Sequence, residues 1–174
     1  MRVLIVYAHQ SPTSFCHAVL EQFTRGLGEA GHDYEVVDLY ASKFNPVMGL
    51  RDMTFFAHES VLLEIVESMQ PRQGLLALAP GGPVGRFVVR RWLRGKTTRD
   101  IVRLMARFRP KDALDQQAKL ARADALAVIA PVYWMGFPAI LKGWVDRVFS
   151  HGFAYALSPD GWNAMPPDGF RCCG

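Results

Sequence analysis

The sequence lacks the features that mark a secreted, membrane-spanning or metal-binding protein. Its 174 residues contain three cysteines, too few for a disulfide framework. No apolar run approaches the roughly 20 residues that a membrane span needs, and the N-terminus lacks the regions of a signal peptide. The five histidines show no metal-ligand spacing, so we expect no metal site. We therefore expect a protein of the cytoplasm.

Glycine-rich phosphate loops are lacking as well. The sequence contains neither G-x-G-x-x-G nor G-x-x-x-x-G-K-[ST]. The segment PGGPVGR (80–86) holds glycines but follows no strand-like run, so a turn is the better interpretation. Half of the residues are hydrophobic and 21% are charged, which excludes a disordered chain. A chain of this length can bury roughly 70% of its unfolded surface in one core.

The N-terminal residues have the pattern of a strand, a helix and a second strand. Residues 3–8 are apolar throughout, which is typical of a central strand in a parallel sheet. Apolar residues then recur at helical spacing from Ser14 to about Gly31, and residues 34–40 form the next strand-like run. This order predicts a right-handed βαβ unit.

A third buried strand is predicted at 124–131, between helices at 110–123 and 139–149. We expect residues 71–85, rich in glycine and proline, to be irregular, and residues 55–69 and 86–109 to be helical. No strand-like run follows residue 157. The expected parallel sheet therefore has three strands, fewer than the five or so that are usual in doubly wound domains.

The polar segment AHQSPTSF (8–15) lies where the first strand meets the first helix. His9, the hydroxyls of Ser11, Thr13 and Ser14, and the N–H groups of the helix start could hold an anion there. Ligands bind at this end of the strands in open α/β sheets. The alternative is that Thr13 or Ser14 is only a helix N-cap.

The segment APVYWMGFPAILKGW (130–144) follows the third strand and is rich in aromatic residues. Tyr133 and Trp134 offer aromatic faces, and Gly136 would allow a flat ligand to approach the backbone closely. The alternative is a loop that only packs on the core.

Positive charge is concentrated between Arg86 and Lys111. This stretch has ten basic residues and one acid, Asp100, whereas the whole chain has a net charge of +4. It could contact nucleic acid, an anionic membrane surface or a phosphorylated cofactor, or be a solvated helix face.

Three segments together resemble the flavodoxin-like NAD(P)H:quinone oxidoreductase family: LIVYAHQSPTSFCHAV, DLYASKFNPVMG and APVYWMGFPAILKGWVDRVFSHGFAYA. The resemblance implies an α/β, flavodoxin-like, three-layer doubly wound parallel sheet that lacks the last two strands. It implies one domain over residues 1–174, incomplete at the C-terminus, with a basic helical insertion at about 51–109.

The resemblance also implies a flavin site and a flavin-dependent reduction of quinones by NADH or NADPH. The cofactor would be FAD, or alternatively FMN, and the protein a homodimer. Trp134 and Tyr155 would contact the substrate. The catalytic residues stay unknown, because the family's catalytic loop has no counterpart in this sequence. The residues expected to bind the flavin are His9, Thr13, Ser14, Phe15 and Cys16 at the phosphates, and Pro131, Val132, Tyr133, Trp134, Met135 and Gly136 at the ring.

Two other functions stay open at this point. Some relatives are ancillary subunits of potassium-efflux transporters, and residues 86–111 could then contact a transporter or the membrane surface. The chain could also be a truncated remnant without catalytic activity. Nucleic-acid binding is not expected, because the basic stretch matches no recognised module.

Overall fold

The chain folds into two compact units. The first comprises Met1–Val47 and Asp112–Val148, and the second comprises Met48–Lys111 and Phe149–Phe170. The interpretation of residues 51–109 as an insertion into one domain stays a prediction. The structure, a computed structural model, describes residues 1–49, 51–52, 66–67, 70–105, 107, 109–158 and 161–164, with the side chains of 156–164 left out.

The first unit is built on a three-stranded parallel sheet. The strands are β1 (Arg2–Tyr7), β2 (Asp33–Asp38) and β3 (Ala125–Ile129), in the order β2-β1-β3. In the register of the sheet, Val3 lies between Tyr34 and Ala125. The side chains of residues 3–8 are at most 4% exposed, which confirms the prediction of a central strand buried on both faces.

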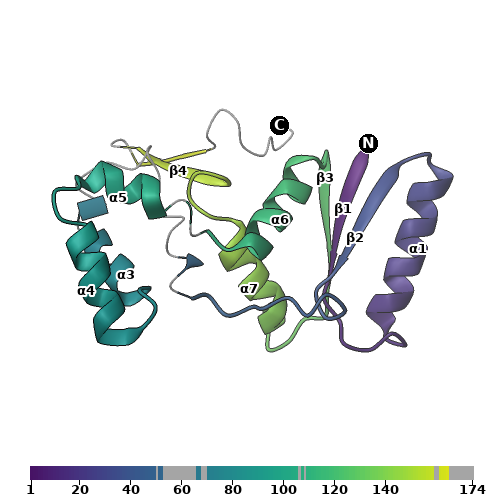
Figure 1. The fold of residues 1–174 in the computed structure, drawn as a ribbon. Helices are drawn as coiled ribbons and strands as arrows, with labels where there is room; N and C mark the ends of the chain where they lie inside the picture. Colours follow the sequence, from purple (N-terminus) through teal and green to yellow (C-terminus); the bar gives the residue numbers. More distant parts are fainter. Residues whose placement is uncertain are drawn as a thin grey trace. The chain divides into compact units, whose positions relative to one another are not determined.

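Helices cover both faces of this sheet. Helix α1 (Phe15–Glu29) lies on one face, and α6 (Lys111–Ala121) and α7 (Ala139–Val148) lie on the other (Figure 1). Leu120 of α6 and Leu141, Trp144 and Val148 of α7 are fully buried. Two helical layers around a parallel sheet, with β1 between β2 and β3, confirm the expected flavodoxin-like α/β fold.

The apolar stripe of α1 is less buried than its spacing suggests. Phe15 is 83% exposed, Val19 38% and Phe23 39%, and Val128 of the edge strand β3 is 44% exposed. In the described part of the first unit α1 is the only helix on this face, so its outer apolar residues have little to pack against.

The second unit has a small helical core of its own. Its helices are α3 (Pro71–Ala77), α4 (Gly82–Trp92) and α5 (Thr98–Met105). The prediction that residues 71–85 are irregular is therefore wrong. Pro71 and Pro83 lie in first turns, where a missing N–H costs no helical hydrogen bond. The predicted helix 55–69 lies mostly outside the described residues. The buried core consists of Val66, Leu75, Leu93, Ile101, Val102 and Met105.

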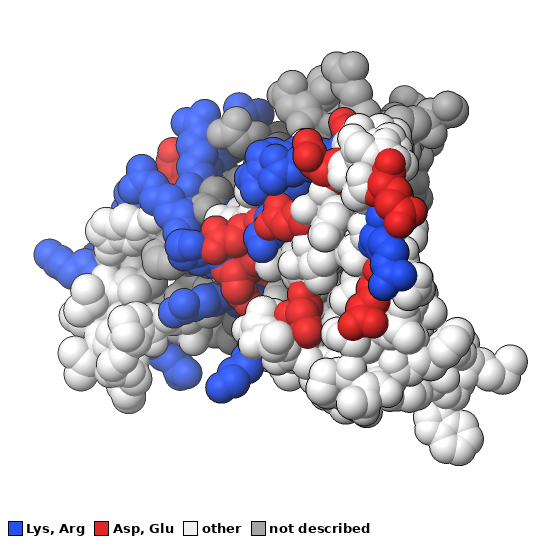
Figure 2. Space-filling model, turned by 90° about the vertical axis from the view of Figure 1, so that its right-hand side faces the viewer, with Lys and Arg blue, Asp and Glu red and all other residues white. Residues whose placement is uncertain are grey.

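Positive charge is prominent on the molecular surface. Figure 2 shows lysine and arginine side chains gathered along one side of the drawn face, with few carboxylates among them. Helix α4 carries Arg86, Arg90 and Arg91, all of them exposed. No helix in the described residues is long and apolar enough to cross a membrane.

The second unit also contains a short hairpin that the sequence did not reveal. Strands β4 (Tyr155–Ser158) and β5 (Gly161–Ala164) pair antiparallel, with Tyr155 opposite Ala164. The expectation that no strand follows residue 157 is wrong, because four-residue strands are too short for a periodic pattern to show. The hairpin forms a separate two-stranded sheet, so the parallel sheet keeps its three strands in the described residues.

Candidate functional site

A cleft lies at the carboxyl ends of the adjacent strands β1 and β3. Its volume is about 480 Å³, within the range of small-molecule sites. The walls are mainly apolar, and they come from the loop after β1, the first turns of α1 and the end of β3. The lining residues are His9, Phe15, Cys16, Val19, Val128, Ile129, Ala130 and Pro131.

The loop after β1 is held by its own polar side chains. The Ser11 Oγ lies 3.1 Å from the Thr13 Oγ1 and accepts a hydrogen bond from the Thr13 N–H at 3.3 Å. Ser14 is the N-cap of α1, because its Oγ accepts from the His17 N–H at 3.2 Å. The cap interpretation of Ser14 is therefore confirmed, and Thr13 is the residue before this N-cap.

His9 is fixed in one orientation by its neighbour. The Ser11 N–H donates to the Nδ1 of His9 at 3.0 Å. In this arrangement Nδ1 is an acceptor, so the neutral ring carries its proton on Nε2 and can donate from there. The first N–H groups of α1 have no partner inside the helix. The start of α1 therefore supplies oriented backbone donors and the positive end of the helix dipole beside a histidine donor.

A contact between side chains joins the two loops of the site. The Gln10 side-chain amide and the Tyr133 hydroxyl are 3.4 Å apart. The Ala8 N–H also donates to the Ile129 carbonyl at 3.0 Å, which extends the ladder between β1 and β3 by one residue. Gln10 had no distinctive signal in the sequence, since a lone glutamine in a polar loop has no particular spacing.

The loop after β3 contains a strained two-residue turn. Tyr133 and Gly136 exchange backbone hydrogen bonds of 3.0 and 2.9 Å, and between them Trp134 and Met135 have φ values of 49° and 64°. Turns of this kind favour Asn-Gly, and each non-glycine residue in this region costs on the order of 1–2 kcal/mol. Strain of this size tends to be found at functional sites.

A close approach of a flat ligand stays a prediction for Gly136. Its φ is not positive, and a Cβ there would meet only the Tyr133 carbonyl oxygen, at 3.8 Å. The unusual backbone conformation instead presents Trp134 and Met135, whose side chains are 102% and 99% exposed. The turn thus displays two large apolar side chains to solvent.

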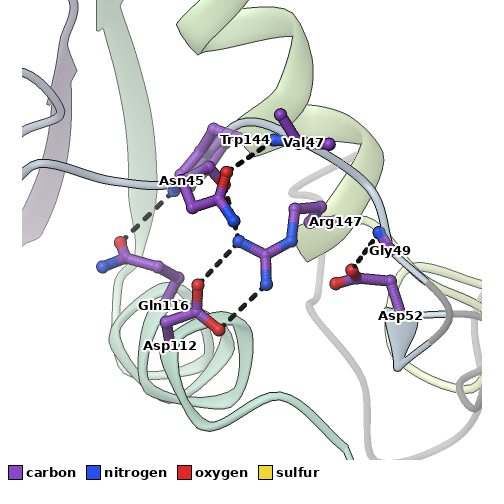
Figure 3. A network of polar contacts seen from close by, with 8 residues as sticks. All are labelled: Asn45, Val47, Gly49, Asp52, Asp112, Gln116, Trp144 and Arg147. Atoms are coloured by element: carbon purple, nitrogen blue, oxygen red, sulfur yellow. Dashed lines mark hydrogen bonds and ion pairs between the residues drawn. The ribbon is translucent and has the colours of Figure 1, made fainter. Parts of the chain in front are cut away.

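The helix that follows this turn is anchored by a buried arginine. Arg147 of α7 is 4% exposed, and its guanidinium donates to the two carboxylate oxygens of Asp112 at 2.6 and 2.9 Å (Figure 3). It also donates to the Asn45 carbonyl at 2.6 Å and lies 5.2 Å from the Phe44 ring centroid. The network ties α7 to α6 and to the segment after β2.

Helix α7 also approaches this segment closely at Gly143. A Cβ at this position would lie 2.1 Å from the Pro46 carbonyl oxygen. No side chain larger than hydrogen fits there without movement of the backbone. Together with the Arg147 network, this contact fixes the helix that supports the Tyr133–Gly136 turn.

Two titratable groups of the described residues have shifted pKa values that bear on these features. Partial burial acts to raise the pKa of Asp112, but the hydrogen bonds and positive charge of Arg147 outweigh it, so the net pKa is lowered. Burial raises the pKa of the Tyr155 hydroxyl. Tyr155 belongs to the second unit, where its ring packs edge-on against His151.

The structure brings together only part of the predicted flavin site. His9, Phe15, Cys16 and Pro131 line the cleft, and Thr13 and Ser14 lie in the loop beside it. Val132 and the Tyr133–Gly136 turn continue from Pro131 and are exposed. The sequence-based set omitted four apolar lining residues, which are Val19 of α1, Val128 and Ile129 of β3, and Ala130 directly after β3.

Comparisons with known proteins agree with this geometry. The family model described as having a flavodoxin-like fold matches residues 1–170. The chain is 33% identical to NAD(P)H dehydrogenase [quinone] 1 of Cavia porcellus over 90% of this chain and 46% of the relative. It is 32% identical to ribosyldihydronicotinamide dehydrogenase [quinone] of Pongo abelii over 90% of this chain and 54% of that protein.

A solved structure gives the same result. The NAD(P)H:quinone oxidoreductase of Methanothermobacter marburgensis superposes with a TM-score of 0.57 and 33% identity, covering 90% of this chain and 57% of that chain. This chain therefore spans about half the length of the relatives it matches. From the strand order, the position of the cleft and the family model that matches residues 1–170, we conclude that the chain belongs to the flavodoxin-like fold family, and it is similar in sequence to NAD(P)H:quinone oxidoreductases.

Proposed function

We propose that this chain carries the flavin-binding part of an NAD(P)H:quinone oxidoreductase. The observation that supports this most directly is the cleft at the carboxyl ends of β1 and β3, which has the N-terminus of α1 at one end, where an anion could bind, and apolar walls elsewhere. A flavin has the same two halves, an anionic phosphate chain and a flat, largely apolar ring system.

The residues present fit the phosphate half of such a cofactor. The first N–H groups of α1 and the Nε2–H of His9 are donors suited to phosphate oxygens, and the Thr13 hydroxyl lies one residue before the N-cap. Donors to an anion form charge-assisted hydrogen bonds, which are about twice as strong as neutral ones. Ser14 holds the helix start in place through its bond to His17.

The ring half would rest against the end of β3 and the turn that follows it. Ala130 and Pro131 would exclude water from one edge of the ring, and the exposed Trp134 would provide an aromatic surface for the acceptor. The bond between Gln10 and Tyr133 would keep the phosphate loop and the ring loop at a fixed separation.

The bound flavin would accept a hydride from NAD(P)H and pass a hydride to a quinone-type acceptor. The protein's own part is to orient the ring, exclude water and hold the phosphates. We propose FAD as the cofactor, with FMN as the alternative to be tested. We also propose a homodimer in which Tyr155 contacts the substrate, to be tested by size-exclusion chromatography and by the activity of Tyr155→Phe.

Titration of the purified protein with FAD and, separately, with FMN tests this proposal. We expect a perturbed flavin absorbance spectrum that bleaches on addition of NADH or NADPH and recovers when a quinone is added. Thr13→Val should weaken binding about tenfold, because a hydrogen bond to a charged group contributes about 1.5 kcal/mol or more.

Thr24→Val is the matched control. Its hydroxyl donates within α1 to the carbonyls of Leu20 and Glu21, away from the cleft, so flavin binding should not change. The proposed site is wrong if the protein perturbs the absorbance spectrum of neither FAD nor FMN. It is also wrong if Thr13→Val and Thr24→Val bind flavin equally well.

A further inference from the structure

The second unit displays an unusual surface on α4. The helix turns Val89 toward the unit's core, and Leu93, which follows its last turn, is 2% exposed. The opposite side carries large apolar residues that remain in solvent. Val84 is 72% exposed, Phe87 67% and Val88 58%. An outward apolar group of this kind on one helix typically marks a contact surface.

Arginines flank these apolar residues on the same helix. Arg86, Arg90 and Arg91 are exposed, and Arg94 follows just after α4. Trp92 is 49% exposed, and the Lys96 ammonium lies 4.6 Å from its ring centroid. We call Val84, Phe87, Val88 and Trp92, with Arg86, Arg90, Arg91 and Arg94, the α4 surface.

The stretch of sequence that contains this surface has little negative charge. Asp100 is the one acid among the residues from Arg86 to Lys111. Its carboxylate accepts hydrogen bonds from the Thr97 N–H and hydroxyl at 2.9 and 2.7 Å, so it caps the start of α5. The cationic character of the stretch is therefore only slightly offset.

We propose that the α4 surface binds an anionic phospholipid membrane, with the helix lying in the plane of the interface. Arginines beside exposed Val, Phe and Trp match the two parts of such an interface, because the cations pair with headgroup phosphates and the apolar groups enter the acyl boundary. A purely electrostatic partner such as nucleic acid would use the arginines but would leave Val84, Phe87 and Val88 in water. The proposal is independent of the flavin site.

Co-sedimentation with phospholipid vesicles tests this inference on the full chain. We expect binding to vesicles of phosphatidylcholine with 30% phosphatidylserine and little binding to pure phosphatidylcholine, with binding reduced by salt. The double variant R90Q/R91Q should lower the partition coefficient about 25-fold, since each cation near an anionic surface contributes about fivefold. The double variant R25Q/R122Q removes the same charge from exposed arginines of the first unit and should change binding little.

A second pair of matched variants tests how much the apolar side chains contribute to vesicle binding. Val84→Ser should weaken vesicle binding about fivefold or more, because the side chain would lose its burial in the acyl boundary. Val47→Ser, at a residue of the first unit that is 68% exposed, should not. Quenching of tryptophan fluorescence by brominated lipid should fall in Trp92→Phe and persist in Trp134→Phe.

Several results would overturn the proposal. These are equal binding to neutral and anionic vesicles, equal loss in R90Q/R91Q and R25Q/R122Q, or quenching that depends on Trp134. Binding to duplex DNA or to an acidic polypeptide at physiological salt, without binding to the anionic vesicles, would also overturn it and assign the surface to a different partner. As a control, circular dichroism of each variant should show that the fold is retained.

Discussion

The ion pair between Arg147 and Asp112 gives the sharpest test of how α7 is held in place. Replacing Asp112 by Ala would remove both carboxylate acceptors from a guanidinium that is 4% exposed and would leave the Asn45 carbonyl as a partner. Breaking a fully buried pair costs about 3–5 kcal/mol. Because the Asp112 side chain is 47% exposed, solvent screens part of this interaction. We expect a loss of about 2 kcal/mol.

Urea denaturation followed by circular dichroism measures this loss. For a chain of this size, 2 kcal/mol corresponds to a decrease of about 4–8 °C in the melting temperature. The chain contains a control on the same helix, the exposed pair of Lys142 and Asp146, whose side chains are 60% and 39% exposed. Asp146→Ala removes the same kind of carboxylate and should cost no more than about 0.5 kcal/mol.

The pH dependence supplies an independent check. The folded-state pKa of Asp112 is lowered, so its contribution to stability is present above the unfolded value near 4 and is lost as the pH falls through the folded value. The wild type should therefore lose more stability below about pH 4 than Asp112→Ala does. Equal costs for the two alanine variants, or parallel pH curves for wild type and Asp112→Ala, would show that the buried pair does not anchor α7.

Three further predictions concern the turn and the two helix contacts. Replacing Trp134-Met135 by Asn-Gly should raise the melting temperature, since it relieves about 1–2 kcal/mol of strain per residue. It should also lower the rate of quinone reduction, and an unchanged rate would show that the strained turn has no part in the activity. Ser14→Ala should cost about 1 kcal/mol in urea denaturation through loss of the N-cap and should weaken flavin binding, while Ser42→Ala serves as the control for binding. Gly143→Ala should destabilise the protein by about 1–3 kcal/mol, because its Cβ would overlap the Pro46 carbonyl; a melting temperature equal to that of the wild type would contradict the close contact.

Some features of this protein follow from local sequence patterns. The apolar run 3–8, the strand-like run 34–40 and the run before Pro131 predicted three strands, and the helical spacing after Ser14 predicted the helix between the first two. Residues 3–8 gave the clearest signal, because burial on both faces of a parallel strand leaves a continuous apolar signature. The N-cap at Ser14 was equally visible, since a hydroxyl before a periodic run is a local signal. Local patterns also placed both loops of the candidate site at the carboxyl ends of strands.

Tertiary structure alone decided the rest. The contact between Gln10 and Tyr133 and the bond from Arg147 to Asp112 join residues far apart in the chain, and neither has a signature in spacing. The helix at Pro71–Ala77 forms although its glycine and proline content argues against it, because Leu75 joins a buried cluster with residues of α5. Likewise, the positive φ values fall on Trp134 and Met135, not on a glycine, because the hydrogen bonds between Tyr133 and Gly136 close the turn around them. Local propensity is a weak preference of about 1 kcal/mol or less per residue, and packing between distant segments overrides it.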